Sequence, residues 1–358
     1  MAKKRKVNPI KTLSGERKKS SFAGKAFSLF FLAVVIPLVI IILIEIVLRF
    51  AGYGKEWPLF TETRLHGRDY ITLNPDYSQK YFLNESFTFP HYDLFLKDKP
   101  QNALRIFVLG SSTVYGFPYH QGISFPSVLE NRLADAYPDK HIEVINVAVT
   151  AINSYTLADR IDEILEQQPD AILIYAGHNE FYGALGAGAY GGMGNVHSLK
   201  KLHLYMLRYS FYQGIRTLVD GISGGGVPEL EAESQQVATL MERITRNRNI
   251  EYQSRIYQKA HRHFELNMEN VLRRAKVENV PVFIGDLVSN IGDLEPFVKE
   301  ENGEKSQAMI AFEQAEQLLQ QGFADSARVL FAHARDLDGI RFRASGEING
   351  IIKELSKK

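Results

Sequence analysis

The chain of 358 residues contains no cysteine. Disulfide bonds therefore cannot stabilise it, and a domain outside the cytoplasm would have to fold without them. Net charge is nearly absent too, because 42 lysines and arginines face 41 aspartates and glutamates, leaving a formal charge of +1. The basic excess typical of nucleic-acid-binding proteins is missing, so we expect no nucleic-acid partner. With 45% apolar residues, the chain is long enough to bury a large core.

Several short motifs that would assign a chemistry are also missing. The stretch "GSSTVYGF" at 110–117 has no lysine and is therefore not a Walker loop. It does not contain the Gly-x-Ser-x-Gly elbow of an α/β-hydrolase either. His261 and His263 would diverge on a helix, and we find no metal-ligand cluster in the sequence. We expect neither a metal nor a cofactor.

One long apolar run near the start of the chain is its clearest positive feature. Residues 26–44 carry no charge, and the apolar character continues to residue 50 around Glu45. About 20 such residues cross a bilayer as a helix. A cleaved signal peptide would have only about 7–15 apolar residues, followed by small residues at the cleavage site. We therefore expect an uncleaved signal anchor over 26–50. Glu45 and Arg49 lie one turn apart near its end, where they could pair or extend toward the membrane interface.

The residues before this run indicate its orientation. Residues 1–25 contain nine lysines and arginines against one glutamate. Positively charged flanks stay on the cytoplasmic side of a membrane. We expect 1–25 in the cytoplasm, one pass through a bacterial inner membrane, and the main domain in the periplasm or outside the cell.

The rest of the chain divides by its hydrophobic periodicity. Residues 51–102 are aromatic and rich in proline with no clear period, and we expect an irregular lead-in. From 103 to 300, strand-like runs (104–109, 142–149, 170–176 and 280–286) alternate with helical stretches (123–137, 154–168 with Ser154 as its N-cap, and a helical insertion over 198–276). This alternation predicts a parallel sheet covered by helices on both sides, a three-layer α/β/α, flavodoxin-like fold.

Residues 301–358 form a helical tail. Ala315, Ala327, Phe331 and Ala334 have the spacing of a tetratricopeptide unit. A plain helical hairpin packed on the main domain fits the pattern equally well. In either case the tail could bind a protein partner.

Small and polar residues follow three of the predicted strands. They are Gly110-Ser111-Ser112-Thr113, the stretch 146–151, and Gly177-His178-Asn179. In an open parallel sheet, ligands bind where the carboxyl ends of the strands meet. A phosphate held by hydroxyl and N–H groups stays open as one interpretation. Acyl transfer accounts for all three strand ends, with Ser112 as nucleophile and with N–H and side-chain amide donors for an oxyanion.

These three stretches resemble blocks of the SGNH (GDSL-type) hydrolase family. "VLGSSTVYG" is similar to the first block, "INVAVTAINSY" to the second and "GHNEFYG" to the third. From about residue 103 onward, the chain resembles a membrane-anchored subgroup with tetratricopeptide-like helices. The resemblance implies that Ser112 is the nucleophile. It also implies that the backbone N–H of Ala151, where the family usually has glycine, and the side chain of Asn179 stabilise the oxyanion.

Further residues are assigned by the same resemblance. Gly110, Gly177 and His178 would shape the site, and Glu180 stands where the family usually has aspartate. The implied activity is ester hydrolysis through an acyl-serine intermediate. An acylated glycan, a lipid or a small ester would all serve as substrate.

The family's fourth block, Asp-x-x-His, is missing. It supplies the general base that removes the serine proton. None of the ten histidines has an aspartate three residues earlier, and only His333 lies beyond the fourth predicted strand. Truncation before the base, a non-catalytic relative that acts as an anchored binding module, and a histidine from elsewhere are the three explanations. We expect truncation, which would leave a sheet edge and apolar surface exposed.

Overall fold

In a computed structural model of the chain, residues 30–82, 93–119, 121–188, 196–222 and 249–358 are described. The chain divides into two units, Met1–Lys55 with Tyr209–Gly224, and Glu56–Arg208 with Gly225–Lys358. The predicted helical insertion over 198–276 is therefore divided between the two units. Its helix α7 (Ser210–Ile222) belongs to the smaller unit, whereas α6 (His197–Met206) and α9 (Arg255–Val277) belong to the larger.

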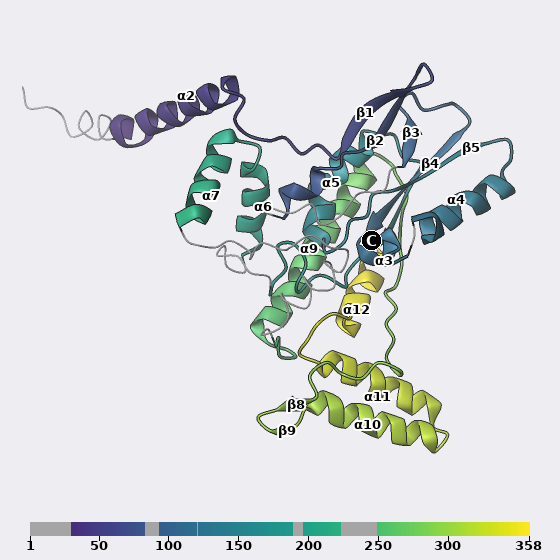
Figure 1. Cartoon of the computed structure of the whole chain (residues 1–358). Helices are drawn as coiled ribbons and strands as arrows, with labels where there is room; N and C mark the ends of the chain where they lie inside the picture. Colours follow the sequence, from purple (N-terminus) through teal and green to yellow (C-terminus); the bar gives the residue numbers. More distant parts are fainter. Residues whose placement is uncertain (1–29, 83–92, 120, 189–195, 223–248) are drawn as a thin grey trace, which may run out of the picture. The chain divides into compact units, whose positions relative to one another are not determined.

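The smaller unit is built on the apolar run. A π-helical turn, η1 (Phe31–Val35), continues into α2 (Ile36–Phe50), and α7 packs beside α2 (Figure 1). Phe31–Phe50 has a mean hydropathy of 3.2 with none of the window buried, and its length and composition suit a membrane span. Of the two alternatives for Glu45 and Arg49, the structure shows pairing, with Arg49 donating to the Glu45 carboxylate at 2.6 Å. The first residues of the predicted span, 26–29, lie outside the described residues.

The larger unit contains the predicted parallel sheet. Its strands are β4 (Ala103–Gly110), β5 (His141–Asn146), β6 (Ala171–Tyr175) and β7 (Val282–Ile284), hydrogen-bonded in the order β5-β4-β6-β7. On one face, Ile106 and Val108 of β4 pack with Leu129 and Leu133 of α4 (Phe125–Ala136). On the other face lies α5 (Ser154–Leu165), which packs on α9. The predicted three-layer α/β/α fold is confirmed (Figure 1).

The segment 51–102, which we expected to be irregular, contains a second sheet. Strands β1 (Phe60–Leu65), β2 (Arg68–Leu73) and β3 (Leu94–Leu96) pair antiparallel. The β1–β2 loop is only His66-Gly67, with φ of 47° and 79°. Positive φ at both positions is typical of a tight hairpin turn whose twist matches the strands, so "HG" between alternating residues was the signal for this hairpin.

This small sheet is part of the core. Phe60 and Phe95 pack edge-on against Phe107 of β4, with ring centroids 5.8 and 5.6 Å away. The side chain of Arg105, 1% exposed, donates to Glu143 of β5 at 2.6 Å and to the Leu96 carbonyl at 2.6 Å. A guanidinium this buried is stable only when paired and hydrogen-bonded, and the small sheet provides part of that pairing. The described lead-in residues from Glu56 onward therefore belong to the larger unit, whereas those up to Lys55 belong to the smaller one.

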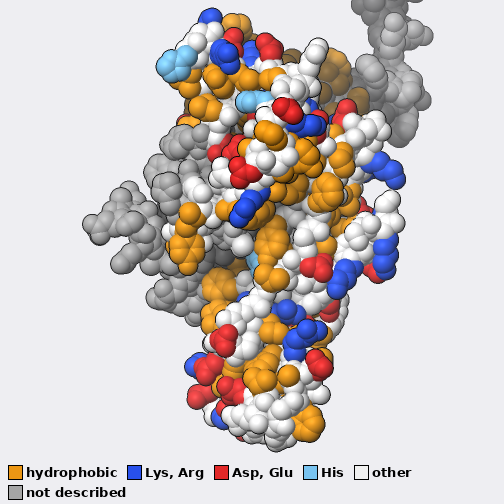
Figure 2. Space-filling view, turned by 90° about the vertical axis from the view of Figure 1, so that its right-hand side faces the viewer, with side chains coloured by type: hydrophobic (Ala, Val, Ile, Leu, Met, Phe, Trp, Pro, Cys, Tyr) orange, Lys and Arg blue, Asp and Glu red, His pale blue; other side chains and the backbone are white. Residues whose placement is uncertain are grey.

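The tail begins with a short hairpin, β8 (Glu300–Glu301) and β9 (Glu304–Lys305), and continues as α10 (Gln307–Gln320) and α11 (Ala324–Leu337). The residues with tetratricopeptide spacing form the interface of these two helices: Ala315, Ala327, Phe331 and Ala334 are all buried there. The last helix, α12 (Gly346–Leu355), packs on α9 of the main domain. The face shown in Figure 2 mixes both signs of charge over the described residues, in agreement with the nearly neutral composition.

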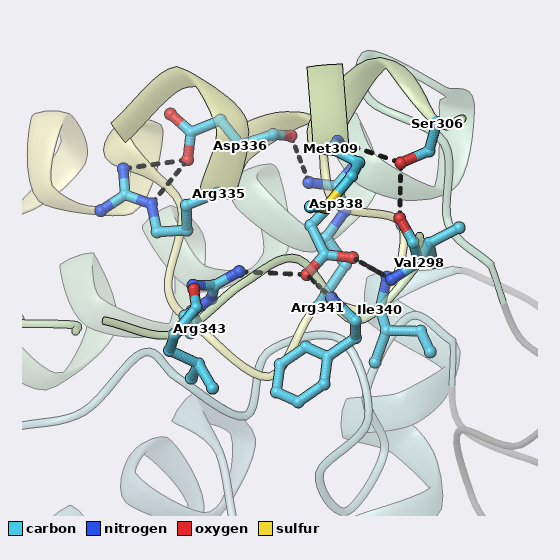
Figure 3. A network of polar contacts seen from close by, with 12 residues as sticks. Val298, Ser306, Met309, Arg335, Asp336, Asp338, Ile340, Arg341 and Arg343 are labelled. Carbon is cyan, nitrogen blue, oxygen red and sulfur yellow. Dashed lines mark hydrogen bonds and ion pairs between the residues drawn. The ribbon is translucent and has the colours of Figure 1, made fainter. Parts of the chain in front are cut away.

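A buried carboxylate joins the two ends of the helical hairpin (Figure 3). Asp338, 1% exposed, accepts hydrogen bonds from the backbone N–H groups of Phe297 and Val298 at 2.9 and 3.2 Å. It also accepts from the backbone of Ile340 at 3.2 Å and pairs with the Arg343 guanidinium at 3.1 Å. The chain entering β8 and the chain leaving α11 are thus held at one point.

Candidate active site

The three polar strand ends lie at one edge of the sheet. Strands β4, β5 and β6 are parallel, with Val108 opposite Asn146 and Gly110 opposite Tyr175. The Asn146 side chain donates to the Val114 carbonyl at 2.9 Å, which ties the end of β5 to the segment after β4. The predicted convergence of the strand ends is confirmed.

Ser112 begins α3 (Ser112–Tyr115), a single helical turn directly after β4. Its side chain is partly exposed. Among the described residues, neither its hydroxyl nor its backbone N–H has a hydrogen-bond partner. Both groups are therefore available to a reactant.

Two glycines make room at this edge. A Cβ on Gly110 would overlap the Val114 side chain and would lie 2.6 Å from the Tyr175 carbonyl oxygen. Gly177 has φ of +150°, and a Cβ there would lie 2.5 Å from Leu287 Cδ1. A side chain at Gly110 would therefore collide with the backbone of β6, and one at Gly177 would displace the side chains of Leu287 and Ile348.

Ala151 occupies a strained conformation. Its φ is +60°, in the left-handed region, which costs an L-residue roughly 1–2 kcal/mol. Its carbonyl accepts from the Ala184 N–H at 2.9 Å, and this bond holds the loop after β5 against the loop after β6. In the described part of the chain, the Ala151 N–H has no hydrogen-bond partner. Strain of this kind is concentrated at functional sites.

Asn179 is fixed beside this loop. Its side chain is 8% exposed, and its amide nitrogen donates to the Ile152 carbonyl at 3.0 Å. An asparagine amide carries two hydrogens, and the described residues provide a partner for only one of them. The second hydrogen is free to donate to a bound group.

The structure reveals a buried network next to Asn179 that sequence analysis missed. Glu180, 2% exposed, accepts from the backbone N–H of Ser154 at 2.9 Å and from its hydroxyl at 2.7 Å. The amide of Asn267 on α9 donates to the Ser154 hydroxyl at 3.0 Å. We expected Ser154 to be the N-cap of α5, and this was wrong. The N-cap is Asn153, whose side chain accepts from the Tyr155 N–H. Both serine and asparagine are common N-cap residues, so the sequence did not show which of the two neighbours caps the helix.

Glu180 is expected to make stability depend on pH. Burial raises the pKa of its carboxyl to about 7, although both Ser154 hydrogen bonds and Lys200 lower it. When the pKa of a carboxyl is higher in the folded than in the unfolded state, protonation stabilises the fold. This stabilisation is complete at pH values below the unfolded-state pKa, and it is lost as the pH rises through the folded-state pKa. Between pH 4.5 and about 7, the unfolding free energy of the wild type should fall by up to about 3 kcal/mol relative to Glu180→Gln.

Urea midpoints of both chains in the same detergent at pH 5 and pH 7.5 measure this difference. The comparison with the variant is needed because burial lowers the pKa values of His197 and His263, which changes stability in the opposite direction. Equal pH dependence in both chains would contradict the assignment to Glu180.

None of the described histidines is hydrogen-bonded to Ser112. His178 accepts through Nδ1 from the Ala344 N–H at 3.2 Å, and burial, with Arg335 nearby, lowers its pKa. Three further rings contact other groups: His261 contacts Ser345, His263 contacts Tyr155 and the partly buried His197 contacts Asn267. His333 lies on α11 against Tyr252. His91 and His120 are outside the described residues.

Within the described residues, β7 has no strand on its outer side. β7 is the last strand in the sheet order, and Phe283 is 62% exposed. A cavity of about 1020 Å³ borders this strand. Its walls include Val282 and Ile284 of β7, Leu266, Leu272, Arg273 and Lys276 of α9, and Leu355 and Lys358 at the end of α12.

No protein-family model matches the chain, and no curated protein sequence matches it. Similar solved structures include AlinE4, an SGNH-hydrolase family esterase (15% identity, 62% of this chain, 96% of that chain, TM-score 0.25). Others are a putative G-D-S-L family lipolytic protein from Desulfitobacterium hafniense (17%, 61% and 99%, TM-score 0.22) and a catalytic mutant of the Geobacillus stearothermophilus acetylxylan esterase Axe2 (13%, 72% and 94%, TM-score 0.28). These SGNH-type and GDSL-type proteins belong to the family that the sequence blocks resemble. At such low TM-scores the likeness carries no argument, and the fold assignment depends on the sheet topology itself.

Proposed function

We propose that this protein is a membrane-anchored SGNH-type ester hydrolase that acts through an acyl-serine intermediate at Ser112. The observation that carries the proposal is the set of free groups at one sheet edge. These are the Ser112 hydroxyl, the N–H groups of Ser112 and Ala151, and one amide hydrogen of Asn179, none of them partnered within the described residues. One nucleophile and three donors are what acyl transfer requires.

The reaction would proceed in two steps. The general base takes the Ser112 proton as the Ser112 oxygen attacks the ester carbonyl carbon, and the oxyanion accepts hydrogen bonds from the three donors. The carbon–oxygen bond to the alcohol then breaks, and the alcohol leaves with a proton from the general base. In the second step water attacks the acyl-serine, which releases the acid and restores the hydroxyl.

The general base, in this proposal, belongs to an Asp-x-x-His segment that follows Lys358 and adds a strand to β7. The open β7 edge and the cavity beside it support this. Four described histidines also support it, because they already hydrogen-bond to other groups: His178, His197, His261 and His263. A backbone edge of this kind readily accepts a further strand.

The location follows from the apolar helix. Residues 26–50 would anchor the chain in a bacterial inner membrane, with residues 1–25 in the cytoplasm and the main domain in the periplasm or outside the cell. The substrate would be an ester on a glycan, a lipid or a small molecule. The helical hairpin α10–α11 would be free to bind a protein partner.

A non-catalytic anchored binding module is the second candidate. The observation in its favour is that no described histidine contacts Ser112. In such a module the free donors would bind a carbonyl or an anion without turnover.

Covalent capture tests the proposal. A fluorophosphonate reacts with a serine only when its proton is removed, forming an oxygen–phosphorus bond and releasing fluoride. We would treat the chain 1–358, and the chain extended to the end of its reading frame, and locate the adduct by mass spectrometry. The proposal expects Asp-x-x-His to be encoded downstream and Ser112 to be modified far faster in the extended chain. An extended chain that stays unmodified, or is modified elsewhere, would favour the binding module.

A further inference from the structure

Helix α7 carries an uncovered apolar stripe. Ile215, Leu218, Val219 and Ile222 are 42%, 63%, 54% and 78% exposed. Their spacing of i, i+3, i+4 and i+7 places them on one face of the helix. Large apolar side chains exposed together on one face are typical of a surface that contacts a membrane or another protein.

The start of α7 is fixed to one position on the apolar helix α2. The Glu45 carboxylate accepts from the backbone N–H groups of Ser210 and Phe211 at 3.1 and 2.8 Å. Arg49 pairs with the same carboxylate. The negative charge therefore caps the first turn of α7, where it is favourable to the helix dipole.

Glu45 lies where the membrane surface would be. The uncharged run before it has 19 residues, and a helix of that length is about 28 Å long at about 1.5 Å per residue. The hydrocarbon core of a bilayer is about 30 Å thick. In the proposed orientation, Glu45 and the start of α7 lie at the outer boundary of that core.

The polar side of α7 is already in contact with protein. The Gln213 side chain accepts from the Lys55 N–H at 2.9 Å and donates to the Lys55 carbonyl at 2.8 Å. On a helical wheel, Gln213 lies roughly 170° from the middle of the apolar stripe, at 3.6 residues per turn. The segment after α2 contacts the polar side of α7 through Lys55. The apolar stripe lies on the opposite side of α7 and is directed away from this segment.

We infer that α7 is a membrane-surface helix whose apolar stripe inserts between lipid headgroups and acyl chains. This inference rests on the proposed membrane anchor and is independent of the proposed catalysis. The helix carries one arginine, Arg216, and one aspartate, Asp220, so that its side-chain charges cancel. Insertion should therefore depend on apolar contact and not on anionic lipid. The partner is the lipid surface of the membrane that α2 spans.

Single labels test this, since the chain has no cysteine of its own. Leu218→Cys and Ile222→Cys place an environment-sensitive fluorophore on the stripe. Thr217→Cys is the matched control, because Thr217 is also exposed but lies on the opposite side of the helix. Leu43→Cys reports on α2. The full chain of each variant is labelled and reconstituted into phosphatidylcholine vesicles with and without brominated lipid.

We expect the labels at 218, 222 and 43 to emit at shorter wavelength and to be quenched several-fold more by brominated lipid than the label at 217. Adding anionic lipid should change this little. If 43 is quenched but 218 and 222 behave like 217, the anchor stands and the inference on α7 is wrong. If 43 also stays in water, both the anchor and the inference fail.

Discussion

Replacing Ser112 with alanine is expected to abolish hydrolysis of p-nitrophenyl acetate by the chain that carries its general base. Removing a serine nucleophile from a complete site costs on the order of 10⁶-fold in kcat. A small rate above that of water should persist, because the N–H of Ala151 and the amide of Asn179 would still stabilise an oxyanion. Initial rates of the purified wild type and variant in the same detergent measure the loss.

The neighbouring serine provides the matched control. Ser111 also follows β4, but it is 5% exposed and precedes the helical turn. Ser111→Ala should retain activity within a few-fold of the wild type. If Ser111→Ala removed the activity and Ser112→Ala did not, the nucleophile would have been assigned to the wrong serine. Equal activity in all three chains would mean that the observed hydrolysis does not occur at this site.

Asp338→Asn is expected to destabilise the larger unit by about 3–5 kcal/mol, the usual cost of breaking a buried ion pair. The variant leaves the Arg343 guanidinium, whose side chain is 9% exposed, without its opposite charge. An amide group also has a single acceptor oxygen, so the N–H groups of Phe297, Val298 and Ile340 cannot all keep their partner. Unsatisfied buried donors add to the cost.

Urea unfolding of the full chain in detergent measures this effect, with Asp325→Asn as the control. Asp325 lies exposed in the first turn of α11, so the same chemical change there should alter stability by no more than about 0.5 kcal/mol. Hydrogen exchange adds a local measurement, because loss of the Asp338 contacts should expose the amides of α10 and α11 first. Equal midpoints for the two variants would show that the Asp338 network contributes little.

Sequence periodicity was sufficient for much of this protein. The uncharged run before Glu45, the alternation of strands and helices, and the buried face of Phe331 and Ala334 all depend on residues close together in the chain. The convergence of the segments after β4, β5 and β6 followed too, because parallel strands bring their carboxyl ends to one edge.

Other features depend on pairs that no local pattern contains. Ser154 was interpreted as a helix cap, yet it links Glu180 to Asn267, which is 113 positions away. The segment with β1, β2 and β3 looked irregular because its burial depends on Phe107 and Arg105 in another sheet. Glu45 was expected to pair with Arg49 or to extend toward the membrane interface, but its contact with the start of α7 spans more than 160 residues.

The sequence by itself determined the long apolar helix, the order of the elements and the three polar strand ends, because each depends on local spacing and composition. Only the tertiary structure decided which buried charges pair, that the donors of Ser112, Ala151 and Asn179 are left free among the described residues, and that α7 exposes its apolar stripe. The physical reason is that hydrogen-bond partners and exposure are set by contacts between distant segments, which exist only after the chain has folded.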